Sequence, residues 1–117
     1  MIKLVYFLKR HPGLSRDEFK ALYEGRHARL GEKHARRAAR YVRRYLEPLP
    51  ELFTGSKTEP EHDVITELWY DNQADYEADM AHLSQSEVIA EIVADEETIF
   101  DRSKHRMFTV EECDSRL

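Results

Sequence analysis

Apolar side chains, many of them β-branched or aromatic, are concentrated in four short segments of the chain, at residues 2–9, 39–46, 63–70 and 104–111. Short segments of this composition, separated by turn residues, are typical of β-strands. In the first segment, Ile2, Leu4, Tyr6 and Leu8 share one face, but the other face is also apolar, with Val5 and Phe7. A strand that is apolar on both faces is expected to be covered on both sides.

Between the first two strands the apolar residues follow a helical period. Ser15 and Glu18 form the pattern of a capping box, in which each side chain bonds the backbone N–H of the other residue. The helix is predicted to run from residue 16 to about His27 or beyond. Gly31 either ends it or is a tolerated break before His34. The apolar positions behind this prediction are Phe19, Leu22, Tyr23 and Leu30.

The second half of the chain repeats the succession of strand, helix and strand. Residues 73–83 are predicted to form a helix, and Ser84 or Ser86 can cap a further helical segment that continues to about Phe100. The order is therefore β-α-β-β-α-β, which predicts an α+β, ferredoxin-like protomer with a four-stranded antiparallel sheet and helices on one face. We expect a single domain over residues 1–111 and a loose C-terminal tail over residues 112–117.

Two features of this arrangement predict a partner. The open face of such a sheet would still carry apolar side chains, so a second copy of the chain is expected to cover it. The connection over residues 49–62 is long and rich in Pro, Gly, Ser and Thr. It is a candidate for a pocket rim or a partner contact.

The charges are unevenly distributed along the 117 residues, although the net charge is only −5. Residues 26–44 hold eight basic residues and one acid, whereas residues 58–101 hold fourteen acids and no Lys or Arg. A basic block can indicate nucleic acid or an anionic substrate. Because nucleic-acid domains are usually basic overall, we favour the interpretation that the two blocks face each other, within the fold or across a dimer.

The sequence lacks the features of several classes of protein. No apolar run is long enough for a membrane span, and the opening residues lack the features of a signal peptide. One cysteine, Cys113, leaves no internal disulfide or multi-cysteine zinc site. A cytoplasmic protein that binds no membrane is the simplest interpretation.

His27 is the most informative candidate for chemistry. It lies in the helical stripe of Phe19, Tyr23 and Leu30, where side chains are usually aliphatic. An imidazole there is either a packing residue with a satisfied hydrogen bond or a general acid/base that faces a pocket. Spacings of four and seven place Tyr23 and His34 near the same face. His34 is a second acid/base or a surface histidine, and the neighbouring basic residues favour the surface. No carboxylate lies at a helpful spacing, so we predict no metal site.

Aromatic side chains of the strands are candidates for a binding pocket. Tyr6, Tyr41 and Trp69 lie on adjacent or paired strands of the predicted topology and can line a pocket for a flat, apolar ligand. Ordinary core or dimer packing is the alternative for each of them. Arg40, Arg43 and Arg44 can attract a carboxylate, or pair with acids across an interface.

The chain resembles the EthD family of dimeric α+β barrel proteins. The resemblance rests on five motifs in the right order, which extend from about Ile2 to Val110: residues 7–15, Glu18-Phe19, His27, residues 67–71 and residues 94–101. It implies a ferredoxin-like protomer that pairs sheet against sheet as a homodimer. Relatives include proteins of ether-degradation operons, a methylmuconolactone isomerase, and fungal decarboxylases or dehydratases of polyketide-derived aromatics. The family histidine is often followed by Gly-Pro, where this chain has Ala28-Arg29.

The resemblance also bears on Asp95 and on cofactors. Asp95 falls in the Ala-Asp-Glu part of the family pattern, where it can orient His27, bind a substrate hydroxyl, or cap the turn at residues 96–100. We favour capping. Cofactor-free chemistry is common among the characterised relatives, so no cofactor is expected.

Three hypotheses follow. The leading one is a small, cofactor-independent enzyme that isomerises, cyclises, dehydrates or decarboxylates a hydrophobic carbonyl, lactone or phenolic compound, with His27 as acid/base. The second is a non-catalytic ligand-binding or accessory protein of an oxidative degradation pathway. The third is an RNA-binding ferredoxin-like domain, but the chain lacks its aromatic signature and is acidic, so no nucleic-acid partner is expected.

Overall fold

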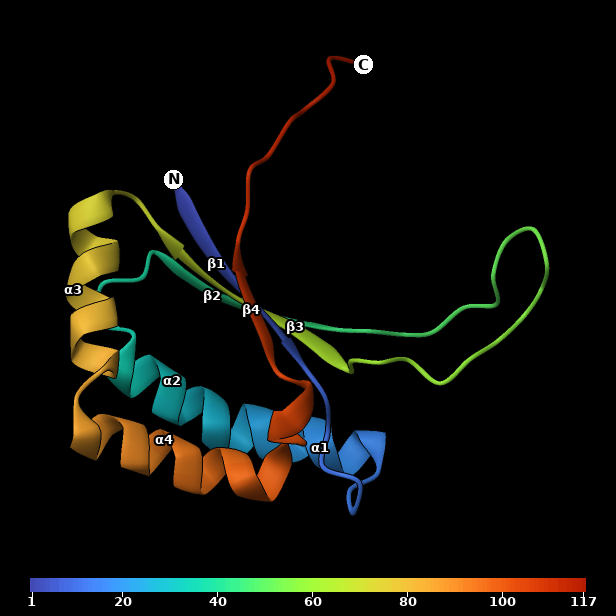
Figure 1. Cartoon of the computed structure of the whole chain (residues 1–117), viewed down its shortest axis with the longest axis horizontal. Helices are drawn as coiled ribbons and strands as arrows, with labels where there is room; N and C mark the ends of the chain where they lie inside the picture. The colour runs from blue at the N-terminus through green and yellow to red at the C-terminus, as the bar shows by residue number, and fades with distance from the viewer.

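A computed structural model describes all 117 residues of the chain. The strands are β1 (Ile2–Leu8), β2 (Arg40–Tyr45), β3 (Val64–Tyr70) and β4 (Arg106–Thr109), and they form one antiparallel sheet in the order β2-β3-β1-β4. The helices α1 (Arg16–Leu22), α2 (Ala28–His34), α3 (Gln73–Leu83) and α4 (Ser86–Ile99) lie on one side of this sheet (Figure 1). The predicted α+β, ferredoxin-like fold is confirmed.

The register between the two central strands decides which side chains face the helices. Leu4 of β1 lies opposite Leu68 of β3, and Tyr6 lies opposite Thr66. Because residues directly opposite each other share a face, the alternate positions, such as the pair Val5 and Glu67, lie on the open face. The helix-facing residues of β3 are all buried, whereas its other residues are only partly covered.

The first helical region is one continuous rod that contains a wider turn. The capping box at Ser15 and Glu18 is present, with both reciprocal hydrogen bonds formed. Between α1 and α2 the chain forms a π-helical segment, η1 (Tyr23–His27), in which the Ala28 N–H donates to the Tyr23 carbonyl. The rod continues through Gly31 to His34, so this glycine does not end it.

An aromatic cluster joins η1 and α4 to the sheet. Tyr23 and Phe19 are almost fully buried, and both rings pack edge-on against Phe100, which follows α4. Ile99 and Val64 complete the buried centre. Removing these large side chains from water is the main stabilising contribution in this half of the core.

The capping prediction for α4 is wrong. Its N-cap is Gln85, which makes no side-chain hydrogen bond. Ser84 instead ends α3, with its hydroxyl donating to the Met80 carbonyl, and Ser86 is already inside α4. Only two residues, Ser84 and Gln85, separate the two helices, so each serine is drawn into a helix end.

The basic and acidic blocks face each other within the protomer, as the favoured interpretation predicts. Four basic side chains of residues 26–44 each contact an acid of residues 58–101; the pairs are Arg26–Asp95, Lys33–Glu91, Arg37–Asp75 and Arg44–Glu67. These contacts tie the first helical rod to α4, the connection after the rod to α3, and β2 to β3.

Two segments project from the body of the molecule (Figure 1). The loop between β2 and β3 carries the well-exposed side chains Leu49, Leu52 and Phe53, and it contributes no residue to the cavity described below. Its interpretation as a pocket rim is therefore wrong for this protomer, whereas a partner contact stays a prediction. Residues 110–117 form no helix or strand. No helix is both long and apolar enough to cross a membrane.

Candidate active site

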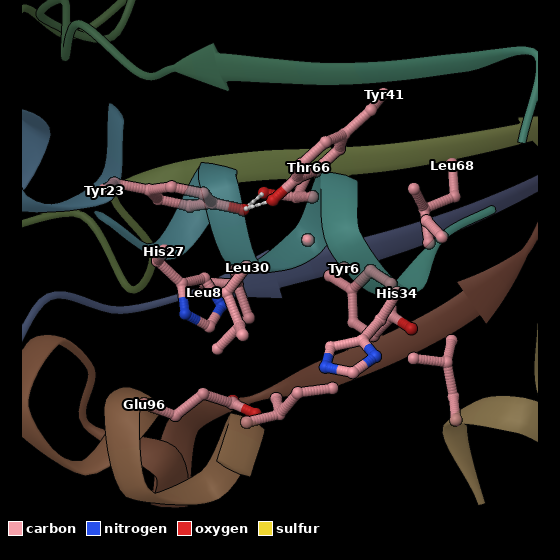
Figure 2. Close-up of a pocket in the computed structure, with 14 residues that line it drawn as sticks. Tyr6, Leu8, Tyr23, His27, Leu30, His34, Tyr41, Thr66, Leu68 and Glu96 are labelled. Atoms are coloured by element: carbon pink, nitrogen blue, oxygen red, sulfur yellow. Dashed lines mark hydrogen bonds between the residues drawn. The ribbon is translucent and has the colours of Figure 1, made fainter. Parts of the chain in front are cut away.

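A cavity of about 130 Å³ lies between the sheet and the helices (Figure 2). It is largely apolar, but several titratable side chains reach it. An apolar cavity of about 150 Å³ is large enough to hold benzene, so this one suits a compound of about one ring. The residues that line it are Tyr6, Leu8, Tyr23, His27, Leu30, Gly31, His34, Ala35, Tyr41, Thr66, Leu68, Leu83, Ile92 and Glu96.

His27 lies at the cavity with one ring nitrogen fixed. Its Nδ1 is 2.8 Å from Oδ2 of Asp95, whose other oxygen is 2.6 Å from Nε of Arg26. A carboxylate only accepts hydrogen bonds, so Nδ1 donates and Nε2 carries the lone pair. Nε2 makes no hydrogen bond with the protein. The geometry therefore leaves the basic nitrogen of this imidazole free.

The environment of His27 favours its neutral form. The ring packs edge-on against Tyr23 and Phe100, and the side chain is 12% exposed. Burial lowers the pKa of His27 below its ordinary value, because charge is costly away from water. The hydrogen bond to Asp95 and its negative charge oppose this shift without cancelling it.

Three tyrosines place hydroxyl groups around the cavity. The Tyr23 hydroxyl is 2.6 Å from Thr66 Oγ1 and 3.3 Å from the Tyr41 hydroxyl (Figure 2). The Tyr6 hydroxyl makes no hydrogen bond with the protein, although burial raises the pKa of Tyr6 to about 12. Burial also raises the pKa of Tyr23 and of Tyr41. All three groups stay protonated at neutral pH and can donate to a ligand oxygen.

His34 is not the surface histidine that its basic neighbours favour. It is 4% exposed and lines the cavity. Its Nδ1 is 2.9 Å from Nε2 of His82, and its Nε2 is 3.1 Å from Oε2 of Glu91. Both partners come from helices that are distant in the sequence, so the local charge pattern could not indicate this burial.

Trp69 does not join Tyr6 and Tyr41 at the cavity, and that prediction is wrong. It lies opposite Lys3 in the register, on the open face of the sheet. The Lys3 ammonium and the Arg40 guanidinium lie 4.0 and 4.4 Å from the indole. Trp69 follows Leu68 in β3, and consecutive strand residues point to opposite faces, so only the buried Leu68 lines the cavity.

Asp95 does not cap a turn, contrary to the favoured prediction. It lies inside α4 and orients His27 instead, as the less favoured alternative had it. Sequence reasoning missed Glu96 and Gly31, which also line the cavity. The wider turn of η1 was a further miss; such turns are frequent at functional sites, but no sequence pattern indicates this one. No group of three or more His, Cys, Asp or Glu side chains is arranged to hold a metal ion.

Sheet, helices and cavity together define a ferredoxin-like α+β protein with a buried pocket between its two layers. The chain belongs to the EthD family, because residues 11–103 match the EthD domain. No curated protein gives a significant sequence match.

Solved structures with the same fold come from several bacteria. An ethyl tert-butyl ether D (EthD) family protein from Bacillus halodurans is 18% identical, with a TM-score of 0.63 over 97% of this chain and 99% of that chain. HapK from Hahella chejuensis is 11% identical, with a TM-score of 0.61 over 100% of this chain and 97% of that chain. A dimeric protein of unknown function and ferredoxin-like fold from Bacteroides fragilis is 10% identical, with a TM-score of 0.54 and 95% of each chain covered. At such low identities these likenesses show the fold alone.

The close approach of Gly31 to Tyr41 generates a first prediction. A Cβ at residue 31 would lie 2.6 Å from the Tyr41 ring and its hydroxyl. Gly31→Ala should therefore displace Tyr41, lower the free energy of unfolding by about 1–3 kcal/mol and weaken the binding of phenol, a one-ring probe. Urea denaturation and an NMR titration measure the two effects.

Gly25→Ala is the matched control, because Gly25 lies in the same rod and its Cβ would meet nothing within 4 Å. It should raise the free energy of unfolding by about 0.5–1 kcal/mol, since alanine loses less backbone entropy in a helix. Equal stability of the two variants would contradict the close approach.

A second prediction concerns the titration of His27. Its imidazole NMR signals should titrate below 6.5, the ordinary value. In Asp95→Asn the pKa should fall further, because the hydrogen bond and charge that raise it are weakened. As the pH falls, the unfolded chain, whose His27 has the ordinary pKa, binds a proton before the folded chain does. The stability that the neutral ring contributes is therefore complete above about pH 6.5 and is lost as the pH falls below that value. A rise of the pKa in Asp95→Asn would contradict this account.

Proposed function

We propose that this protein is an enzyme that catalyses proton transfer on a small hydrophobic carbonyl, lactone or phenolic compound without a cofactor. The observation that carries the proposal is the state of His27. One ring nitrogen is held by Asp95, and the other faces the cavity without a protein partner. Burial keeps the ring neutral, so it is a base at neutral pH.

The surroundings of His27 support this role. Asp95 is fixed by Arg26 as well as by the imidazole, and its negative charge stabilises the imidazolium that forms when Nε2 takes a proton. The Tyr6 hydroxyl, which has no protein partner, can donate to an oxygen that becomes negative. Such an arrangement suits isomerisation, cyclisation, dehydration or decarboxylation, in which a carbon loses a proton or gains one.

The alternative is a ligand-binding protein without turnover. Such a protein would bind its ligand in the same apolar cavity, whose volume is about 130 Å³. This alternative gives no reason for a cavity-lining histidine to have one ring nitrogen held by a partly buried carboxylate and the other left without a protein partner. The two functions differ in one measurement, the exchange of a ligand proton.

We also propose that the protein acts as a homodimer whose open sheet faces pack against each other. Phe7 and Phe108 stack edge-on at 5.4 Å on that face, and Phe108 is 48% exposed. A patch of this kind on a protomer favours a partner. A solved relative of the same fold, from Bacteroides fragilis, is described as dimeric.

His27→Asn tests the proposed chemistry. The asparagine amide can still donate to Asp95, but it offers no basic nitrogen to the cavity. Exchange of the α-protons of cyclohexanone in D₂O, followed by NMR, should slow by about 100-fold or more relative to the native protein. Phenol binding should change little, because the apolar lining is kept.

His11→Asn is the control, since His11 bonds the Gly13 N–H in the turn after β1 and does not line the cavity. It should exchange the protons at the native rate. If the native protein binds phenol but does not accelerate the exchange of α-protons in any carbonyl compound, the ligand-binding alternative holds instead.

Phe108→Glu tests the dimer. The carboxylate would be buried without a partner at the proposed interface, so the dimer should dissociate in analytical ultracentrifugation at micromolar concentration. Ile89→Glu is the matched control, because Ile89 is similarly exposed, at 45%, but lies on α4 away from the open face. A native chain that sediments as a monomer would contradict the proposal.

A further inference from the structure

Glu96 is a cavity-lining carboxyl for which the chemistry above has no role. It follows Asp95 on α4, and consecutive helical residues point about 100° apart. Asp95 therefore reaches the first helical rod, whereas Glu96 reaches the cavity. Figure 2 shows both the Glu96 side chain and the His27 imidazole at this cavity. Two titratable groups of different chemistry thus share one small apolar space.

No cation is paired with Glu96. Its carboxyl contacts one other titratable side chain, His105, whose Nδ1 lies 3.3 Å from Oε2. Burial lowers the pKa of His105 to about 4, so that ring is uncharged at neutral pH. Arg102 attracts the Glu96 carboxylate from a distance, while Asp95 on the same helix repels it.

The balance of these effects favours the protonated carboxyl. Burial is the largest, and it raises the pKa of Glu96 above the ordinary value, with Asp95 adding to the rise and Arg102 opposing it. From β1, Tyr6 lines the same cavity, and its hydroxyl is also held in its neutral form. Glu96 therefore keeps its proton to a higher pH than an exposed glutamate does.

We infer that Glu96 is the acid partner of His27, and that the two act together on an uncharged enolisable carbonyl compound of about one ring. This inference rests on the proposed function and adds to it a second catalytic residue and a substrate class. An acid–base pair of this kind suits reactions that must protonate an oxygen while a carbon loses its proton.

The shift of a carbon–carbon double bond into conjugation with a ketone shows how the pair would work. The His27 Nε2 lone pair takes a proton from the carbon that lies between the carbonyl group and the C=C bond. The electrons of that C–H bond form a C=C bond to the carbonyl carbon, the C=O π pair moves to the oxygen, and the oxygen takes the Glu96 proton. The dienol then returns its O–H proton to Glu96, the O–H electrons reform the C=O bond, and the diene electrons shift so that the terminal carbon takes the proton from His27. Both residues regain their starting states, and no oxidant or reductant is needed.

The lining of the cavity argues for an uncharged substrate. Apart from Glu96, the histidines and the hydroxyl groups, the cavity is lined by side chains such as Leu8, Leu30 and Ile92, and no Lys or Arg lines it. The nearby Arg26 is engaged by Asp95, outside the cavity. An anionic ligand would therefore lose its water without gaining a counter-ion, beside a carboxyl that can itself ionise.

The isomerisation of 3-cyclohexen-1-one to 2-cyclohexen-1-one, followed by the ultraviolet absorption of the conjugated product, tests the inference. Glu96→Gln keeps a hydrogen-bond donor but has no proton to transfer, so kcat should fall by about 100-fold. The native rate should also decline at high pH as Glu96 ionises, and this decline should be absent in Glu96→Gln. Glu97→Gln is the matched control, because Glu97 is the next residue on α4 and is exposed.

The outcomes separate this inference from the proposed function. If Glu96→Gln keeps the native rate while His27→Asn loses it, the acid partner is overturned and the base remains. If the native protein exchanges cyclohexanone protons but does not isomerise the enone, the pair is also overturned. Tighter binding of cyclohexanecarboxylate than of cyclohexanone would overturn the substrate class.

The protonation of Glu96 can be measured without turnover. The side-chain carboxyl carbon, assigned in ¹³C NMR by its absence from Glu96→Gln, should titrate above the ordinary glutamate value of about 4.5. A midpoint at or below that value would overturn the acid role. The fold of each variant is checked in the same spectra.

Discussion

The pairing of β1 with β3 is the constraint on which the site depends. Once Tyr6 lies opposite Thr66, alternation sends Leu8 and Leu68 to the helices as well, and these residues form the sheet side of the cavity. The same register sends Trp69 to the open face with Lys3. A shift of β3 by one residue would exchange the two faces of that strand. Glu67 and Trp69 would then line the cavity in place of Thr66 and Leu68.

The helical side of the cavity depends on the distance of the first helical rod from the sheet. Gly31 lets the rod approach the Tyr41 ring so closely that no side chain fits between them. Earlier in the same rod, the π-helical turn ends at His27, and Arg26 and His27 both reach Asp95 on α4. The rod is therefore held at two points, against β2 and against α4, with the cavity between them.

What the sequence could predict follows from the range of each interaction. The element order, the capping box and the inward direction of His27 depend on neighbours within a few residues, and all were predictable. The burial of His34 depends on His82 and Glu91, and the orientation of His27 depends on Asp95, sixty-eight positions away. These contacts follow from the rotation of α3 and α4 against the rod. Residue spacing within one helix carries no information about that rotation.

Two consecutive carboxyl groups show how the fold assigns different chemistry to similar side chains. Asp95 lies between Arg26 and His27, and both side chains donate hydrogens to its carboxylate oxygens. Glu96 is turned by one residue into apolar surroundings where its nearest ring, His105, is uncharged at neutral pH. Burial raises the pKa of Glu96 there, so two similar side chains on one helix take different roles. The rotation of α4 about its axis, rather than the identity of either residue, therefore decides which of the two orients His27 and which faces the cavity.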